Sequence, residues 1–208
     1  MKGPTMRQRT TQFAATLVVL AGALALQGCI RTGVKLPPQL MTLTATTAAP
    51  AGAALSGPVS GAIIVAEPET DRRLAVQRVP VQVDAATLAY LQKAAWVERP
   101  ARLFQSLLAE TLRVRGSRMV FEAGDTDTRG ATQLSGRLVD MGYDARSRSV
   151  VVRFDAVLEN SGRTEKGVLA TRRFEAVVPG VRPDAEAVAP ALNRAANDVA
   201  GQVADWVG

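Results

Sequence analysis

The sequence predicts an α+β fold: a mixed, largely antiparallel sheet with two main amphipathic helices packed on one face. Two stretches, 100–115 and 184–207, repeat apolar residues with helical spacing. Between them, three strand-like segments follow one another through short connections, which is typical of an antiparallel meander. Several shorter apolar or alternating segments before the first helix predict further strands.

Residues 1–28 have the pattern of a bacterial lipoprotein signal peptide. Lys2, Arg7 and Arg9 precede an apolar stretch over 13–26, which ends in the string Leu26-Gln27-Gly28-Cys29. Cys29 is the only cysteine in the chain. We expect its thiol to carry a diacylglyceryl group and the peptide bond before it to be cleaved. Cys29 is therefore the predicted lipidation site and the predicted N-terminus of the mature protein.

Two alternatives fit the N-terminal segment less well. As a helix, residues 13–26 would span only about 21 Å, against about 30 Å of bilayer hydrocarbon. An ordinary secretory signal would leave a lone thiol in an oxidising compartment. Ile30 follows the cysteine where an Asp would signal retention at the inner membrane in enteric bacteria, so the sequence favours the outer membrane.

Residues 29–60 are expected to form the lipidated N-terminus and a tether, and residues 61–208 a single α+β domain. The tether region is rich in Ala, Thr, Pro and Gly, and within it the alternating segment 39–44 is a candidate first edge strand. Strands are then predicted over 62–66 and over 79–83, where Pro80 indicates a strand start or an edge. Residues 88–96 fit either a short strand or a helical turn.

The first helix is predicted to start at Pro100 and to stop at Gly116. A short strand over 119–121 follows, and then the three meander strands over 133–143, 149–159 and 167–177. In the first of these, the buried face is expected to shift near Gly142. The last helix covers 184–207, and Pro190 should either kink it or mark its regular start.

Composition excludes several classes of function. The chain contains no histidine, which removes Ser-His-Asp and Cys-His catalytic sites and the commonest zinc ligand. The lone cysteine supports neither a disulfide framework nor a thiolate metal site. Aromatic residues make up 4% of the chain and the arginines are scattered, so no nucleic-acid binding is predicted. We predict no catalytic residues, no metal site and no cofactor.

A few residues remain as candidates for contact with a partner or a lipid. Trp96 is one, although a tryptophan beside a predicted helix start is more often part of the core. Arg146 and Arg148 are the others. Together with Arg153 they are expected to form a basic hairpin tip, which would contact anionic headgroups or an acidic partner.

Other conspicuous residues have ordinary structural interpretations. Asp125 and Asp127 are spaced like an acid pair but sit in a predicted solvated turn, and Asp140 and Asp144 are read in the same way. Trp206 is expected to pack between the last helix and the sheet.

Several local strings, in order, resemble the ABC-type transport auxiliary lipoprotein family. The Trp96-Val97-Glu98-Arg99-Pro100 string is similar to the family's tryptophan–acid–proline entrance to its long helix, although Ala101 replaces a usual second proline and Ala95 a frequent arginine. The resemblance extends from about Leu40 to Val207 and includes Leu40-Met41-Thr42-Leu43, Ile63-Ile64-Val65, Glu67-Pro68, Leu134-Ser135-Gly136-Arg137-Leu138, Arg173-Phe174 and Ala204-Asp205-Trp206-Val207.

The resemblance implies a non-enzymatic subunit that works with an MCE-domain protein and an ABC permease and ATPase. Such systems move lipids, mainly phospholipids, between the inner and outer membranes. It implies a protein anchored by lipid at the periplasmic face of the outer membrane, with phospholipid as a candidate ligand; a homo-oligomer is compatible with this role.

Two other functions remain open. The first is an outer-membrane assembly or structural lipoprotein of another envelope machine. The second is a hydrolase that uses only carboxylates, although no acid pair in the chain has a recognisable pocket signature.

Overall fold

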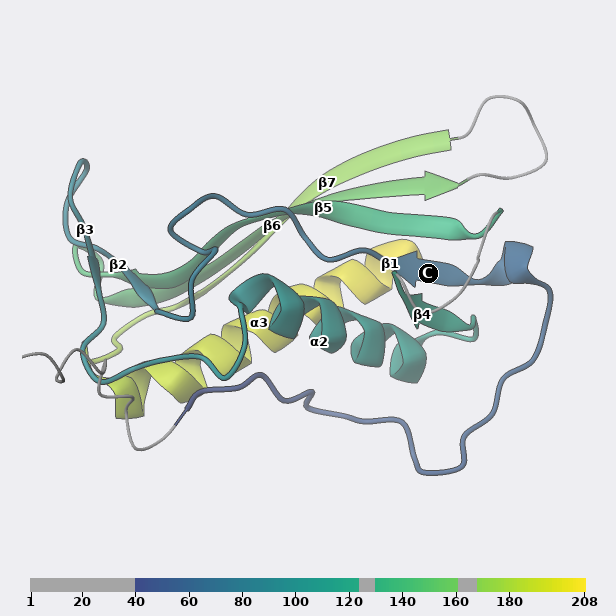
Figure 1. The fold of residues 1–208 in the computed structure, drawn as a ribbon, viewed down its shortest axis with the longest axis horizontal. Coiled ribbons are helices and arrows are strands. Elements are labelled where there is room, and N and C mark those ends of the chain that lie inside the picture. The colour runs from purple at the N-terminus through teal and green to yellow at the C-terminus, as the bar shows by residue number, and fades with distance from the viewer. Residues whose placement is uncertain (1–39, 124–129, 161–167) are drawn as a thin grey trace, which may run out of the picture. The chain divides into compact units, whose positions relative to one another are not determined.

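The computed structural model describes residues 40–123, 130–160 and 168–208. A seven-stranded mixed sheet packs on two helices that lie on one of its faces (Figure 1). The α+β prediction is therefore confirmed. In chain order the elements are a 3-10 turn η2 (Val59–Gly61), β1 (Ile63–Val65), β2 (Pro80–Gln82), β3 (Leu88–Tyr90), α2 (Pro100–Arg115), β4 (Val120–Glu122), β5 (Thr132–Asp144), β6 (Ser149–Asn160), β7 (Val168–Val178) and α3 (Ala185–Val207).

The long strands β5, β6 and β7 form the predicted antiparallel meander. On its other edge, β5 pairs in parallel with β1 near its start and with β2 near its end. The connection between β1 and β2 continues this ladder, because the Glu69 amide donates to the Gly136 carbonyl and the Leu138 amide to the Glu69 carbonyl, both at 2.9 Å. β4 extends the sheet in parallel beyond β1, and β3 extends it in antiparallel fashion beyond β2.

The two helices cover one face of the sheet and form the core with it. Phe104 of α2 meets Phe154 of β6 edge to face, with ring centroids 5.4 Å apart. Phe174 of β7 packs 5.6 Å from Trp206 near the end of α3, as expected for that tryptophan. Apolar residues that alternate along β6 supply the sheet side of this core.

The bounds of the first helix agree with the prediction, and the structure settles the first residue of the second helix. α2 begins at Pro100 and its C-cap is Gly116. α3 begins at Ala185 because the Asp184 carboxylate accepts a hydrogen bond from the Ala187 amide at 2.9 Å. The alternative that this helix starts near Pro190 is therefore wrong, and Pro190 lies on its exposed side.

The expected face shift in β5 lies earlier than predicted. The register with β6 changes between Leu138 and Asp140, so Val139 is the extra residue of a bulge. Gly142 has a different role: a Cβ there would lie 2.5 Å from the Pro80 carbonyl oxygen, so the glycine allows β2 to approach. Gly136, with φ +149°, similarly leaves room for the Asp155 carbonyl oxygen, which would lie 2.1 Å from a Cβ.

The segment before β1 differs most from expectation. Within the described residues, the strand predicted over 39–44 is reduced to one parallel bridge between Met41 and Trp96. Instead, the Thr44 amide donates a hydrogen bond to Asn193 Oδ1 and the Thr46 amide to Asn197 Oδ1, both at 2.8 Å. Further strand pairing is lost because α3 takes these backbone groups. β2 starts at Pro80 as predicted, but it lies between β3 and β5 and is not an edge strand.

Candidate functional site

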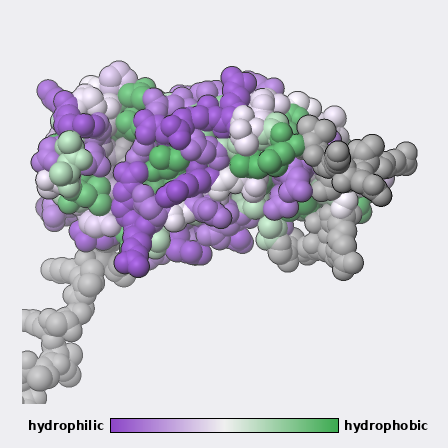
Figure 2. Space-filling view, turned by 90° about the horizontal axis from the view of Figure 1, so that it is seen from above, coloured by the Kyte–Doolittle hydropathy of each residue, from purple (hydrophilic) through white to green (hydrophobic). Residues whose placement is uncertain are grey.

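The face of the sheet away from the helices is largely hydrophilic and is hollowed near the β2–β3 hairpin (Figure 2). A groove of about 370 Å³ lies there between this hairpin and the end of β5 where it turns into β6. We call it the polar groove. Its charged lining comes from Arg73, Asp84, Asp140, Asp144, Arg146 and Arg153.

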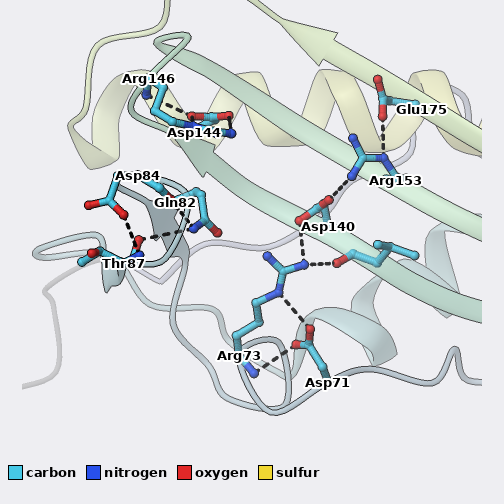
Figure 3. A network of polar contacts seen from close by, with 11 residues as sticks. Asp71, Arg73, Gln82, Asp84, Thr87, Asp140, Asp144, Arg146, Arg153 and Glu175 are labelled. Atoms are coloured by element: carbon cyan, nitrogen blue, oxygen red, sulfur yellow. Dashed lines mark hydrogen bonds and ion pairs between the residues drawn. The ribbon is translucent and has the colours of Figure 1, made fainter.

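A chain of alternating charges crosses this face (Figure 3). Arg73 Nε lies 2.9 Å from Asp71 Oδ2, and Arg73 Nη2 lies 2.8 Å from Asp140 Oδ1. Asp140 also pairs with Arg153, whose Nε lies 2.5 Å from Glu175 Oε2. The chain thus joins the β1–β2 connection to β5, β6 and β7.

The β5 bulge adds a further contact to this chain, because Arg73 Nη2 donates to the Val139 carbonyl. Burial opposes the charge on Arg73, but Asp140 and Asp71 outweigh it, so the pKa of Arg73 lies above its ordinary value. The arginine is thereby fixed as a cation between the connection and β5.

The outer wall of the groove includes Asp144, the last residue of β5, and Asp84, two residues after β2. Asp144 accepts hydrogen bonds from Arg146 Nη2 at 2.7 Å and Nε at 3.0 Å, and these bonds lower the pKa of Asp144. Asp84 accepts from the amides of Ala86 and Thr87 at 2.8 and 2.9 Å, which lowers the pKa of Asp84. Both carboxylates are therefore ionised at neutral pH.

A second, wider groove of about 520 Å³ lies over β5 and β6 beside β1. Glu67, Glu69, Arg137 and Asp155 line it. Arg173 holds Asp155 with two bonds of 2.5 and 2.6 Å, and this pairing lowers the pKa of Asp155. Both grooves are thus lined largely by charged side chains, which suits contact with a polar surface better than enclosure of an acyl chain.

The charged side chains that line the polar groove can bind polar or charged groups of a partner. The acids of the groove are held by arginines or by backbone amides. Across the described ranges, no three metal-ligating side chains come together.

The structure separates the residues that the sequence grouped into a basic tip. Arg146 and Arg148 do lie at the β5–β6 turn, but Arg146 is paired with Asp144. Arg148 has a left-handed backbone with φ of 51°, and its carbonyl accepts from the Val181 amide at 2.9 Å. Arg153 lies away from this turn, within the charge chain on the open face. The expected cluster of three is therefore corrected to two turn residues, one of which is neutralised.

Trp96 lies in the core. Its side chain is 1% exposed, and its Nε1 is buried without a hydrogen-bond acceptor in the described part of the chain. The backbone of Trp96 joins two neighbours, since its amide donates to the Gln77 carbonyl at 3.0 Å and it bridges to Met41. Its position makes it a link between segments.

Three residues singled out in the sequence, Cys29, Asp125 and Asp127, lie outside the described residues. Sequence reasoning also missed Arg73 and Asp84. The signal for Asp84 was local, because an aspartate before Ala-Ala-Thr fits an Asx turn at a hairpin. Arg73 carried no such signal, since its partners Asp140 and Val139 are remote in sequence.

Among the described helices, none is long and apolar enough to cross a membrane. None of the curated proteins matches the sequence.

Solved structures share the fold, and two of them superpose with a TM-score of 0.60. A crystal structure of a Xanthomonas campestris protein of the DUF330 family superposes with a TM-score of 0.60 at 19% identity and covers 70% of this chain and 83% of its own. A structure of an uncharacterised protein gives a TM-score of 0.60 at 13% identity and covers 73% and 95%. A PelC dodecamer from Paraburkholderia phytofirmans is more distant, with a TM-score of 0.40 at 16% identity and coverage of 72% and 92%.

A sequence profile of a transport family also matches the chain. The profile of the ABC-type transport auxiliary lipoprotein component family matches residues 42–204. That range begins at the segment bridged to Trp96 and ends in the last turn of α3, so it takes in the sheet, both helices and the polar groove. The chain belongs to the ABC-type transport auxiliary lipoprotein component family.

Proposed function

We propose that this protein is a non-enzymatic subunit of an MCE-type ABC system that moves phospholipid between the inner and outer membranes. Cys29 would carry the lipid anchor at the periplasmic face of the outer membrane. The observation that carries the proposal is the family match over 42–204. The string Leu26-Gln27-Gly28-Cys29 supports the anchor independently.

The polar groove supports a docking role for the folded domain. Its arginines and aspartates are fixed by one another, so the surface is preorganised before a partner arrives. A charged, open face of this kind selects a partner by electrostatic complementarity. The partner we assign to it is the MCE-domain protein, while ATP hydrolysis belongs to other subunits of the system.

The test compares Cys29→Ser with Ile30→Ser in a strain that lacks the gene. We expect Cys29→Ser to leave the membrane fraction and to fail to restore envelope integrity, because a protein without its acyl chains loses the anchor. Ile30→Ser keeps the cysteine and should stay membrane-bound. Intact-mass measurement of both proteins reports the acylation directly.

In the same strains, crosslinking in vivo followed by mass spectrometry identifies the partner. An MCE-domain protein among the products of the wild-type chain is the expected result. Full complementation by Cys29→Ser would remove the anchor from the proposal. Crosslinks to an outer-membrane barrel protein, without an MCE component, would assign the chain to envelope assembly instead.

A further inference from the structure

Part of the region predicted as a tether, residues 40–49, is fixed along the two helices, and the name tether is kept from here on for residues 29–39. We call residues 40–49 the strap. Besides the two threonine amides held by Asn193 and Asn197, the Ala49 amide donates to Glu110 Oε1 at 2.6 Å. Asn197 Nδ2 returns a bond of 2.9 Å to the Thr44 carbonyl. The strap therefore runs in the same direction as α3 and crosses to α2, beneath the helices in Figure 1.

This direction places Leu40 at the level of the start of α3. Asn193 is the ninth residue of the helix, about 12 Å from its beginning. Leu40 precedes Thr44 by four residues, which cover about 13 Å of extended chain. Figure 1 agrees, since the start of the strap lies beside the first turn of α3. The tether thus joins the domain at this end, which we call the tether end.

Exposed apolar side chains lie together at the tether end. Leu40 is 47% exposed, Val97 50% and Val76 37%. The backbone holds them close to one another, because the Val97 amide donates to the Met41 carbonyl at 2.9 Å and Gln77 Nε2 donates to the Val97 carbonyl at 3.0 Å. An apolar group of this kind marks an interaction site more strongly than isolated exposed residues do.

Arg78, Lys93 and Arg148 lie on segments that meet at this end, which also carries the exposed acids Glu98 and Glu186. Within the described residues, no carboxylate pairs with Arg78, Lys93 or Arg148. The Arg78 guanidinium lies 4.3 Å from the centre of the Tyr90 ring and remains exposed. Arg148 is bound through its carbonyl to the segment that leads into α3. Apolar side chains beside unpaired cations favour a lipid surface with anionic headgroups.

The length of the tether decides how strongly this end is held. With the strap docked, 11 residues lead from Cys29 to Leu40, and they can reach at most about 40 Å. Without docking, the 34 residues from Cys29 to Ile63 could reach about 120 Å. Docking of the strap therefore limits how far this end of the domain can lie from the anchor.

We propose that the tether end, formed by Leu40, Val76 and Val97 with Arg78, Lys93 and Arg148, lies on the membrane surface, and that the docked strap holds it there. The proposal rests on acylation of Cys29, as given under the proposed function. It does not depend on which transport partner binds.

The test uses the full-length acylated protein in vesicles of phosphatidylethanolamine and phosphatidylglycerol that contain a headgroup-linked quencher. Acylation blocks Cys29, so one introduced cysteine is the only free thiol and accepts a fluorophore. Val97→Cys probes the tether end. Val59→Cys is the matched control, since Val59 is 44% exposed and lies in η2, far from the tether end (Figure 1).

We expect the label at residue 97 to be quenched several-fold more than the label at residue 59. The double variant Asn193→Ala and Asn197→Ala should reduce this ratio towards one. Equal quenching in the otherwise native protein, or stronger quenching at residue 59, overturns the proposed orientation. The intact mass of the same sample separates a failure of acylation, which removes the premise, from a failure of the orientation.

Discussion

The indole of Trp96 fills the core where the chain enters α2, and its Nε1 finds no acceptor among the described residues. A buried donor without a partner normally costs free energy. The apolar area of the ring and its position between Met41 and Gln77 outweigh this cost. The tryptophan–acid–proline string thus acts as packing for the helix entrance.

Trp96→Ala should lower the free energy of unfolding by about 3–5 kcal/mol, because the substitution leaves a cavity in the core. Val97→Ala, at an exposed neighbouring side chain, should change it by less than about 0.5 kcal/mol. Urea unfolding followed by circular dichroism measures both. If Trp96→Ala were as stable as Val97→Ala but lost its crosslinks to the partner, Trp96 would be a surface contact after all.

At the scale of elements, α3 tolerates a proline within its second turn. Pro190 and Glu186, four residues before it, are both exposed. Water can therefore satisfy the Glu186 carbonyl that the missing amide would have bound. The Asp184 cap starts the helix ahead of the proline, which explains why the sequence left two alternatives for its first residue.

Pro190→Ala should raise the free energy of unfolding by about 1–3 kcal/mol, since it restores a backbone hydrogen bond at an exposed helical position. Arg194→Ala, also exposed on α3, serves as the control and should be nearly neutral. Thermal unfolding of the three proteins gives the comparison. A loss of stability in Pro190→Ala would show that the ring itself packs against the domain.

At the scale of the whole molecule, the strap joins the two ends of the described chain. Asn193→Ala with Asn197→Ala removes the side-chain acceptors for the Thr44 and Thr46 amides. We expect these amides to exchange hydrogen much faster in the double variant, while amides in β5 and β6 stay protected. Mass spectrometry of exchanged peptides measures this. Unchanged exchange over 40–49 would show that packing of Met41 and Leu43 alone holds the strap.

Local patterns predicted much of the fold, and remote pairings accounted for the rest. Alternation and turn spacing located the meander, and helical periodicity with Pro100 and Gly116 located α2. No local pattern encodes the parallel pairing of β1 and β2 with β5, because the partners are far apart in sequence. The bulge at Val139 belongs to the pairing of β5 with β6, and it lies earlier than the face shift that the sequence predicted near Gly142.

The candidate site was less predictable than the fold for the same reason. Arg146 and Arg148 were located by their turn, but their charge balance depends on Asp144, which sequence reasoning had set aside as a solvated group. The polar groove needs the β1–β2 connection to reach β5, so Arg73 becomes visible only in three dimensions. The sequence allowed Trp96 to lie either at the surface or in the core. The exposed fraction of its side chain, which only the structure gives, places it in the core.

The bond between Thr44 and Asn193 spans 149 positions of the chain, and this separation governs the order of folding. If the chain is exported from its N-terminus, as the proposed lipoprotein signal implies, Thr44 crosses the membrane long before Asn193 does. The strap has no helix to dock on until nearly the last residues have crossed, and closing so long a loop is entropically costly until the sheet is assembled. During export, the chain between the anchor and the domain would therefore include residues 40–49. It would become shorter only when the folded domain binds the strap.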